Sequence, residues 1–190
     1  STIAGILAAK NRGYSGEITI GGVPLNAVNE ENLMQKVVLV RHNSYLFKGT
    51  VEENLKMAKP DATKEEMEAV LQKVNLLGFL QTQDGLQTQL LEKASNLSGG
   101  QCQRLVIARA LLRTDSAVYI FDEAASNIDV ESEELIMNVI HELAKTKTVL
   151  LISHRLANVV KSDKIYFLKD GEIKESGKHD ELMRQNGEIG

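Results

Sequence analysis

The chain has 190 residues, of which 43% are hydrophobic and 25% are charged, and its formal net charge is −4. These values are typical of one globular domain with a sizeable core and exclude a disordered tail. The negative net charge argues against sequence-independent binding of nucleic-acid phosphates, which requires a basic face. The single cysteine, Cys102, excludes an intramolecular disulfide framework. The longest apolar runs are far shorter than the ~20 residues that a membrane-spanning helix needs.

The sequence pattern predicts that strands and helices alternate along the chain, except in one helical block. In chain order the pattern predicts a helix from residue 1, strands at 16–22 and 37–40, a helical block at 50–112, a strand at 117–121, a helix at 131–145, a strand at 148–153, a short helix at 156–161 and strands at 164–168 and 172–175. Thr63 with Glu66 indicates a capping box, and Asp170-Gly171 strongly indicates a hairpin turn. This alternation predicts a largely parallel sheet with helices on both faces.

The most specific stretch is NLSGGQCQR, residues 96–104, followed by a helical run. Ser98 is positioned to cap that helix, and the glycines that follow it leave backbone N–H groups exposed at the helix N-terminus, where the helix dipole favours an anion. A generic Ser-Gly-Gly is more often only a capped, glycine-rich helix start. In this sequence the motif continues through Gln101, Gln103 and Arg104, and the whole stretch resembles the signature motif of the ATP-binding cassette family, which implies a phosphate-binding helix end.

Two adjacent carboxylates, Asp122 and Glu123, end the apolar strand that begins near Val118. A buried parallel strand delivers its last side chains to the carboxyl edge of the sheet, where open α/β folds bind ligands. Asp122 is then positioned to hold Mg²⁺, and Glu123 to polarise a water for attack on a γ-phosphate. An isolated Asp-Glu pair commonly just caps the next helix.

In this order, the motifs resemble those of the ATP-binding cassette (ABC) family. Residues 97–101 resemble the family's signature motif, which implies that Ser98, Gly99, Gly100 and Gln101 bind nucleotide. Asp122 and Glu123 resemble the Walker B aspartate and the catalytic glutamate. Residues 125–129 are similar to the D-loop, which crosses the dimer interface in the family and makes Asp129 a further nucleotide-binding candidate. Residues 152–155 resemble the switch-histidine motif, which assigns His154 to the γ-phosphate.

The first two residues, Ser1 and Thr2, look like the end of a phosphate-binding loop of the form G-x-x-x-x-G-K-[ST], in which the hydroxyl binds Mg²⁺. By this resemblance the glycines and the lysine of the loop would stand before residue 1. We therefore expect the chain to begin just after the Walker A lysine and to carry only half of that phosphate site. Ser1 joins Asp122 as an expected Mg²⁺ ligand, and Thr2 is expected to bind nucleotide.

The sequence departs from the family's pattern in two places. Residues 90–94 keep the acidic residue of the stretch that precedes the signature but lack its usual glycines, and the second departure replaces a glutamine. The family has a glutamine after the strand that corresponds to residues 37–40, where it contacts Mg²⁺ and the attacking water. Aligning residues 46–54 with the family places His42 there. Histidine can ligate a metal or donate a hydrogen bond, but it differs in reach and its charge titrates. His42 is therefore a candidate for both the nucleotide and the metal.

The resemblance implies a P-loop NTPase-like α/β fold with an inserted α-helical subdomain. Residues 1–44 and 113–190 would form the nucleotide-binding core, and residues 45–112 the helical subdomain. The implied function is an exporter-type, Mg-dependent ATPase that takes ATP and Mg²⁺. Its implied partners are a second nucleotide-binding domain and a transmembrane domain, with no nucleic acid, which would place it at the cytoplasmic face of a membrane.

Two alternatives remain open. A non-transport ABC ATPase of DNA repair or chromosome maintenance also carries the signature and the Walker B pair, but such proteins usually insert long coiled coils or zinc modules between the two halves of the domain. The other alternative is a non-catalytic fragment, which the expected lack of the phosphate loop makes a serious interpretation.

Overall fold

The computed structural model describes residues 1–8, 13–185 and 187. The chain divides into two compact units, Ser1–Ile152 and Ser153–Gly190, and each is described by itself. Among the described residues, no helix has the length and hydrophobicity needed to cross a bilayer.

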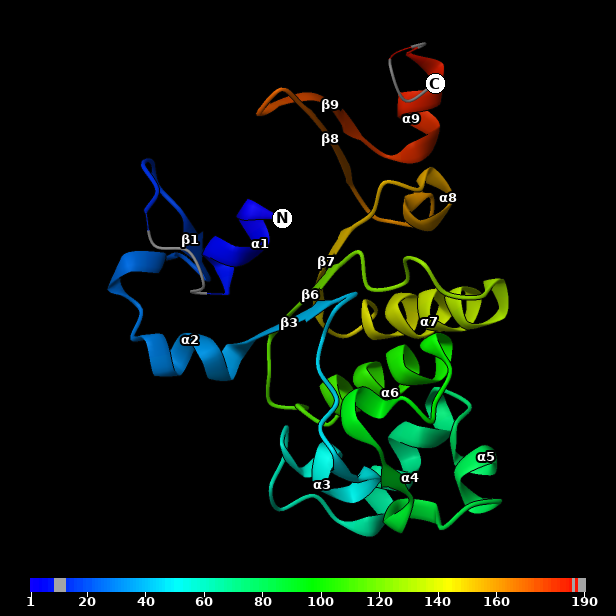
Figure 1. The fold of residues 1–190 in the computed structure, drawn as a ribbon. Helices are drawn as coiled ribbons and strands as arrows, with labels where there is room; N and C mark the ends of the chain where they lie inside the picture. The colour runs from blue at the N-terminus through cyan, green and yellow to red at the C-terminus, as the bar shows by residue number, and fades with distance from the viewer. Residues whose placement is uncertain (9–12, 186, 188–190) are drawn as a thin grey trace. The chain divides into compact units, whose positions relative to one another are not determined.

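A three-stranded parallel sheet forms the centre of the first unit (Figure 1). Its strands are β3 (Val37–Arg41), β6 (Val118–Asp122) and β7 (Thr148–Ile152), in the order β3-β6-β7. These strands confirm the ones predicted at 37–40, 117–121 and 148–153 to within one residue at each end. Because the strands are parallel and in register, Arg41, Asp122 and Ile152 lie side by side at the carboxyl edge.

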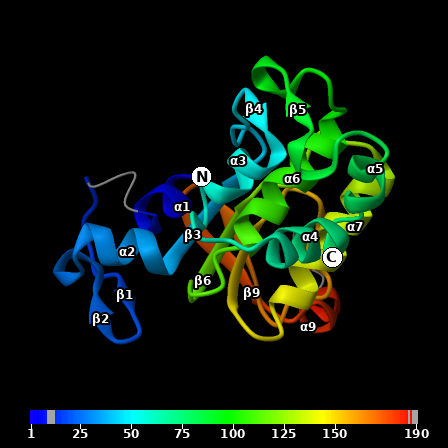
Figure 2. The same ribbon diagram turned by 90° about the horizontal axis from the view of Figure 1, so that it is seen from below.

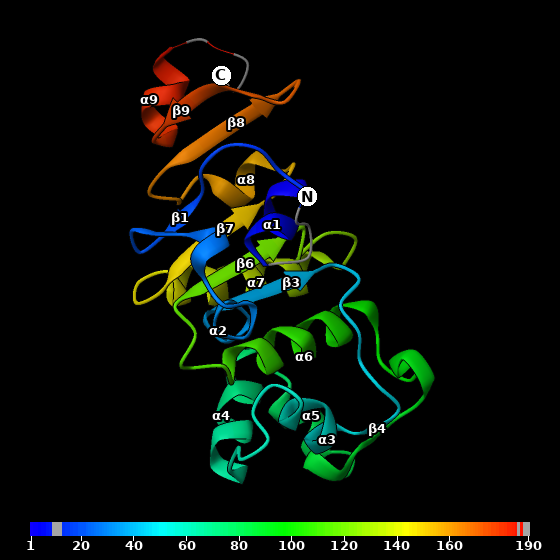
Figure 3. The ribbon, with the colours of Figure 1, turned by 90° about the vertical axis from the view of Figure 1, so that its left-hand side faces the viewer.

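Both faces of the sheet are covered, as the alternating side chains of β6 show. Tyr119 and Phe121 pack in one core with the helices α6 (Gly99–Leu111) and α7 (Val130–Leu143). Ile120 packs in a second core with residues of α1 (Thr2–Leu7) and α2 (Glu30–Lys36). Figure 3 shows α1 on the opposite side of the sheet from α6. The predicted layer arrangement is therefore confirmed.

The helical block ends in α6. Before that helix it contains the short strands β4 (Gly49–Thr50) and β5 (Gln89–Leu90), the helices α3 (Val51–Lys56), α4 (Lys64–Lys73) and α5 (Leu77–Gln81), and the 3₁₀ helices η2 (Gly85–Gln87) and η3 (Glu92–Ala94). Of these, α3 and α4 pack against α6. The capping box of Thr63 and Glu66 is present at the start of α4, as predicted, and a second box of Thr50 and Glu53 starts α3. These boxes satisfy backbone N–H groups that a helix start otherwise leaves unpaired. Whether residues 45–112 are a separate subdomain stays a prediction.

The segment before β3 is built from short elements. They are α1 (Thr2–Leu7), β1 (Thr19–Ile20), β2 (Val23–Pro24), the 3₁₀ helix η1 (Leu25–Ala27) and α2 (Glu30–Lys36). Figure 2 shows this segment on the opposite side of β3 from α3 to α5. The strand predicted at 16–22 is shorter than expected, because only Thr19–Ile20 forms β1. Gly21 and Gly22 both have positive φ and form the expected glycine turn, which leads into β2 as a hairpin.

The second unit contains α8 (Leu156–Val159), the antiparallel strands β8 (Ile165–Lys169) and β9 (Glu172–Gly177), and α9 (His179–Arg184). Asp170 and Gly171 both adopt positive φ in the turn between β8 and β9, which confirms the predicted hairpin.

Candidate nucleotide-binding site

Ser1 and Asp122 meet at the carboxyl edge of the sheet. Asp122 ends β6 and is only 6% exposed. Its Oδ2 lies against the backbone nitrogen of Ser1, and the Ser1 hydroxyl accepts a hydrogen bond from the N–H of Ala4 at 3.4 Å, capping α1. The structure therefore brings together the two residues, predicted from distant parts of the sequence, that would hold Mg²⁺. Thr2 follows as the exposed first residue of α1.

The donors at this edge suit Mg²⁺. One carboxylate and one hydroxyl are hard oxygen donors, and Mg²⁺ in nucleotide sites keeps several waters and takes its remaining ligands from phosphates. The described residues contain no cluster of three or more His, Cys, Asp or Glu side chains that could form an all-protein cage. The Arg41 guanidinium also faces this carboxylate, since its Nε lies 4.0 Å from Asp122 Oδ2.

Glu123 has a left-handed backbone, with φ of 53°. This conformation is uncommon for a non-glycine residue and tends to occur at functional sites. Its N–H donates to the carbonyl of Ile152 at 3.0 Å, and its carbonyl accepts from the Ser126 N–H at 3.2 Å and from the Ser126 hydroxyl at 2.9 Å. The hydrogen bonds on both sides fix the turn by which the chain leaves β6.

The signature motif forms the start of α6. The Ser98 hydroxyl accepts a hydrogen bond from the Gln101 N–H at 3.1 Å, and Gln101 Oε1 accepts one from the Ser98 N–H at 2.9 Å, which makes a capping box. The expected serine cap is confirmed. Ser98 and Gly99 are exposed, whereas Gly100 is buried.

Gly100 is buried because α7 begins directly beside it. A Cβ built on Gly100 would overlap Asp129 Oδ1 and Ser132 Oγ. Asp129 is the N-cap of α7, and its Oδ2 accepts from the Ser132 N–H at 2.8 Å. Hydrogen bonds from Ser132 lower the pKa of Asp129, with a smaller contribution from the positive charge of Arg104. The sequence indicated Asp129 as a nucleotide contact and gave no sign of this capping role.

The two candidate histidines are both exposed. His42 follows Arg41 directly, next to the carboxyl edge where Asp122 lies. His154 belongs to the second unit, and its neighbour Ser153 accepts a hydrogen bond through Oγ from the Arg155 N–H at 3.1 Å. Their roles at the nucleotide stay predictions.

Gln103 links α6 to this edge of the sheet, a role that its place in the signature motif did not indicate. It is buried in the middle of the signature helix, and its Nε2 donates to the Arg41 carbonyl at 3.3 Å. A glutamine one turn beyond the signature serine was a visible signal, but its partner depends on how α6 packs against β3.

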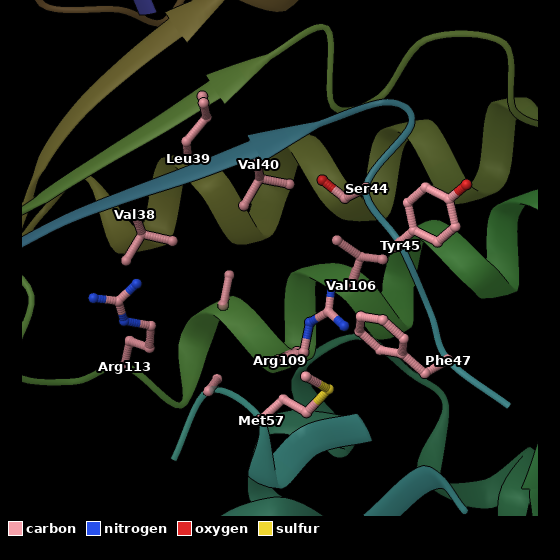
Figure 4. Close-up of a pocket in the computed structure, with 12 residues that line it drawn as sticks. Val38, Leu39, Val40, Ser44, Tyr45, Phe47, Met57, Val106, Arg109 and Arg113 are labelled. Atoms are coloured by element: carbon pink, nitrogen blue, oxygen red, sulfur yellow. The ribbon is translucent and has the colours of Figure 1, made fainter. Parts of the chain in front are cut away.

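A groove of about 310 Å³ opens between β3 and α6, and the segment after β3 and the end of α3 border it (Figure 4). It is lined by Val38, Leu39, Val40, Ser44, Tyr45, Phe47, Met57, Ala58, Val106, Arg109, Ala110 and Arg113. Tyr45, Phe47 and Met57 are 64%, 47% and 60% exposed, which is unusual for side chains of this size. We call this feature the β3–α6 groove.

Fold and site together define an α/β nucleotide-binding domain of the P-loop NTPase class. The family model described as ABC transporter matches residues 1–126. The chain belongs to the ABC transporter family.

Relatives and solved structures agree with this assignment. The chain is 49% identical over 187 residues to an uncharacterized ABC transporter ATP-binding protein of Haemophilus influenzae, covering 98% of this chain and 33% of that protein. It is 40% identical to an ATP-dependent lipid A-core flippase of Vibrio vulnificus, and the match covers 98% of this chain and 32% of the flippase. It is also 40% identical to a multidrug resistance ABC transporter ATP-binding and permease protein of Lactococcus lactis. That match covers 96% of this chain and 31% of the Lactococcus protein.

Among solved structures, a bacterial Atm1-family ABC exporter with ATP bound superimposes with a TM-score of 0.91 at 30% identity, covering 99% of this chain and 33% of that one. The chain thus spans about a third of the length of the curated relatives that it matches.

Proposed function

We propose that this chain is the ATP-binding and ATP-hydrolysing part of an ABC exporter, which uses Mg-ATP to drive a substrate through a transmembrane partner. The observation that carries the proposal is the contact between Ser1 and Asp122 at the carboxyl edge of a parallel sheet. The names of the relatives, which include a flippase and an ATP-binding and permease protein, support it.

The residues at the sheet edge divide the chemistry between them. Ser1 and Asp122 would hold Mg²⁺, which neutralises charge on the phosphates. Glu123 orients the attacking water and accepts its proton, and its fixed left-handed backbone limits how far the carboxylate can move. His42 takes the position at which the family has glutamine. By the resemblance alone, His154 of the second unit corresponds to the family's switch histidine, which would donate a hydrogen bond to the γ-phosphate.

The signature residues act on nucleotide bound by a second nucleotide-binding domain. Ser98 and Gly99 are exposed at the N-terminus of a 13-residue helix, where backbone N–H groups and the helix dipole attract phosphate. Gln101 holds Ser98 through the capping box, and the exposed Asp129 lies beside Gly100 on the same surface. A single chain cannot complete such a site, so turnover requires a dimer.

The transmembrane partner would dock at the β3–α6 groove. Three large, exposed apolar side chains surround the groove, and a patch of this kind is typical of an interaction site. A membrane-embedded partner would place the domain at the cytoplasmic face. The chain's net charge of −4 agrees with a role that does not involve nucleic acid.

Titration calorimetry with Mg-ATP tests the nucleotide site. We would compare the 190-residue chain, the same chain preceded by a strand and a G-x-x-x-x-G-K loop, and the extended chain carrying Asp122→Asn. The extended chain should bind, and Asp122→Asn should remove most of the dependence on Mg²⁺. Asp115→Asn, at an exposed aspartate before β6, is the matched control. Mg-ATP affinity that Asp122→Asn leaves unchanged would refute the assignment.

A further inference from the structure

Arg41 is a cation at the end of a strand face that is otherwise apolar. Val37 and Leu39 alternate with it along β3, and both pack in the second core. Arg41 is the register partner of Asp122 in the parallel sheet, so the two side chains emerge on the same face. The arginine therefore lies on the face where Asp122 is expected to hold Mg²⁺.

Hydrogen bonds on both sides fix the backbone of Arg41. Its N–H donates to Ser44 Oγ at 3.0 Å. Its carbonyl accepts from the Ser44 N–H at 3.2 Å and from Gln103 Nε2 at 3.3 Å. These bonds, from the turn after β3 and from α6, determine where the Arg41 side chain leaves the strand.

The side chain of Arg41, in contrast, is incompletely satisfied. Its Nε is buried and has no hydrogen-bond partner among the residues that the structure describes. Asp122 Oδ2 lies 4.0 Å from it, which is too far for a hydrogen bond and close enough for attraction between the charges. A buried donor without an acceptor is unfavourable, and arginine stays charged in proteins. This arrangement indicates a role at the carboxylate rather than in packing.

The guanidinium changes what Asp122 offers to a metal ion. Of the three side chains aligned at the carboxyl edge, Arg41 and Asp122 carry opposite charges and Ile152 carries none. A cation at this distance attracts the carboxylate and repels Mg²⁺, so it raises the free energy of the ion at Asp122. Phosphate oxygens, which supply further negative charge, would offset that repulsion.

We propose that Arg41 is the counter-ion of Asp122, which Mg²⁺ must displace from the carboxylate, and that Arg41 thereby raises the Mg²⁺ concentration at which the site fills. The inference rests on the proposed function, because it assumes that Asp122 holds Mg²⁺ together with nucleotide. Arg41 is a positioning residue, since it acts on the ion through Asp122. The site then fills only when Mg²⁺ and phosphates are present together.

A Mg²⁺ titration of the full-length transporter tests this role. Calorimetry measures the affinity for AMP-PNP, a non-hydrolysable ATP analogue, at a series of free Mg²⁺ concentrations, and the midpoint of the rise in affinity is compared between variants. Arg41→Gln should lower that midpoint by about tenfold, because it removes the repelling charge. Arg41→Met, a second neutral variant that keeps the apolar stem, should do the same if Arg41→Gln impairs folding.

Two further variants separate charge from shape. Arg41→Lys keeps the positive charge, so its midpoint should stay close to that of the wild type. Lys48→Gln removes an exposed cation further along the same segment and should leave the midpoint unchanged. A midpoint that Arg41→Gln and Arg41→Met leave unchanged or raise overturns the proposal. A midpoint that falls equally in Arg41→Lys also overturns it, because the charge would then not be responsible.

Asp122→Asn in the same titration separates this inference from the proposed function. If Asp122→Asn leaves the dependence on Mg²⁺ intact, the proposed nucleotide site is refuted and the role of Arg41 falls with it. If Asp122→Asn removes that dependence and the neutral variants of Arg41 do not lower the midpoint, only the counter-ion role is overturned.

Discussion

Gly100 in the first turn of α6 lies directly against the Asp129 carboxylate that caps α7. A methyl group at residue 100 would overlap both Asp129 Oδ1 and Ser132 Oγ. The capping carboxylate and the signature helix therefore share one tightly packed contact. Gly100 belongs to the signature motif, which is expected to bind phosphate, and it also allows α6 and α7 to pack closely.

Gly100→Ala should destabilise the chain by about 1–3 kcal/mol, because relief of the overlap must displace the side chain that caps α7. Gly99→Ala is the matched control, since nothing lies within 4 Å of a Cβ built at residue 99. Urea unfolding of both variants measures the difference. Equal stability of the two would show that α7 shifts freely and that the contact is unimportant.

Asp129→Asn should have a lower free energy of unfolding than the wild type at neutral pH. The difference between the two should shrink as the solution becomes acidic. Hydrogen bonds from Ser132 lower the pKa of Asp129 below its usual 3.8. A lowered carboxyl pKa stabilises the folded state above the usual value, and that contribution disappears as the pH falls from about 3.8 through the lowered value.

Urea unfolding at pH 7, 5, 4 and 3 measures this effect. Glu131→Gln, at an exposed position in the first turn of α7, is the control for simple loss of charge. A gap between wild type and Asp129→Asn that stays the same from pH 7 to pH 3 contradicts the linkage.

Asn54→Ala should destabilise the chain by about 1–3 kcal/mol and disorder one end of the β3–α6 groove. Asn54 is buried, and its amide donates to the carbonyls of Phe47 and Thr50 at 2.9 Å and accepts from the Phe47 N–H at 2.7 Å. Thermal unfolding measures the loss, with the exposed Asn43→Ala as control. A melting temperature equal to that of Asn43→Ala would mean that water replaces these bonds.

Glu123→Gln, in a version of the protein that carries the phosphate loop, should reduce ATP hydrolysis by about 10²–10⁴-fold and leave Mg-ATP binding intact. The amide keeps the shape of the side chain but cannot accept a proton from water. Phosphate release and nucleotide affinity, measured on the same preparation, separate the two effects. Undiminished phosphate release would remove Glu123 from its proposed role, and Glu131→Gln should be neutral.

The central strands could be predicted because burial on both faces leaves a clear pattern in the sequence. β3, β6 and β7 are runs of apolar residues flanked by polar ones, and the hairpin at Asp170-Gly171 depends on two adjacent residues. The capping box of Thr63 and Glu66 is equally local. Such features require information from only a few neighbouring positions.

The relationships within the site could not be predicted in this way. The approach of Arg41 to Asp122 depends on the register between β3 and β6, and the bond from Gln103 to the Arg41 carbonyl depends on how α6 packs. The left-handed backbone of Glu123 has no signal in its residue type, because glutamate rarely adopts it. Surrounding hydrogen bonds, rather than local preference, fix that conformation.

The length of α6 has a mechanical consequence. Its 13 residues form one rod of about 20 Å, with the Ser98 cap at one end, the Gln103 bond to the edge of the sheet in the middle and Arg109 in the groove near the other end. A rigid helix passes a displacement along its whole length. The groove and the exposed Ser98 cap therefore lie near opposite ends of one continuous helix.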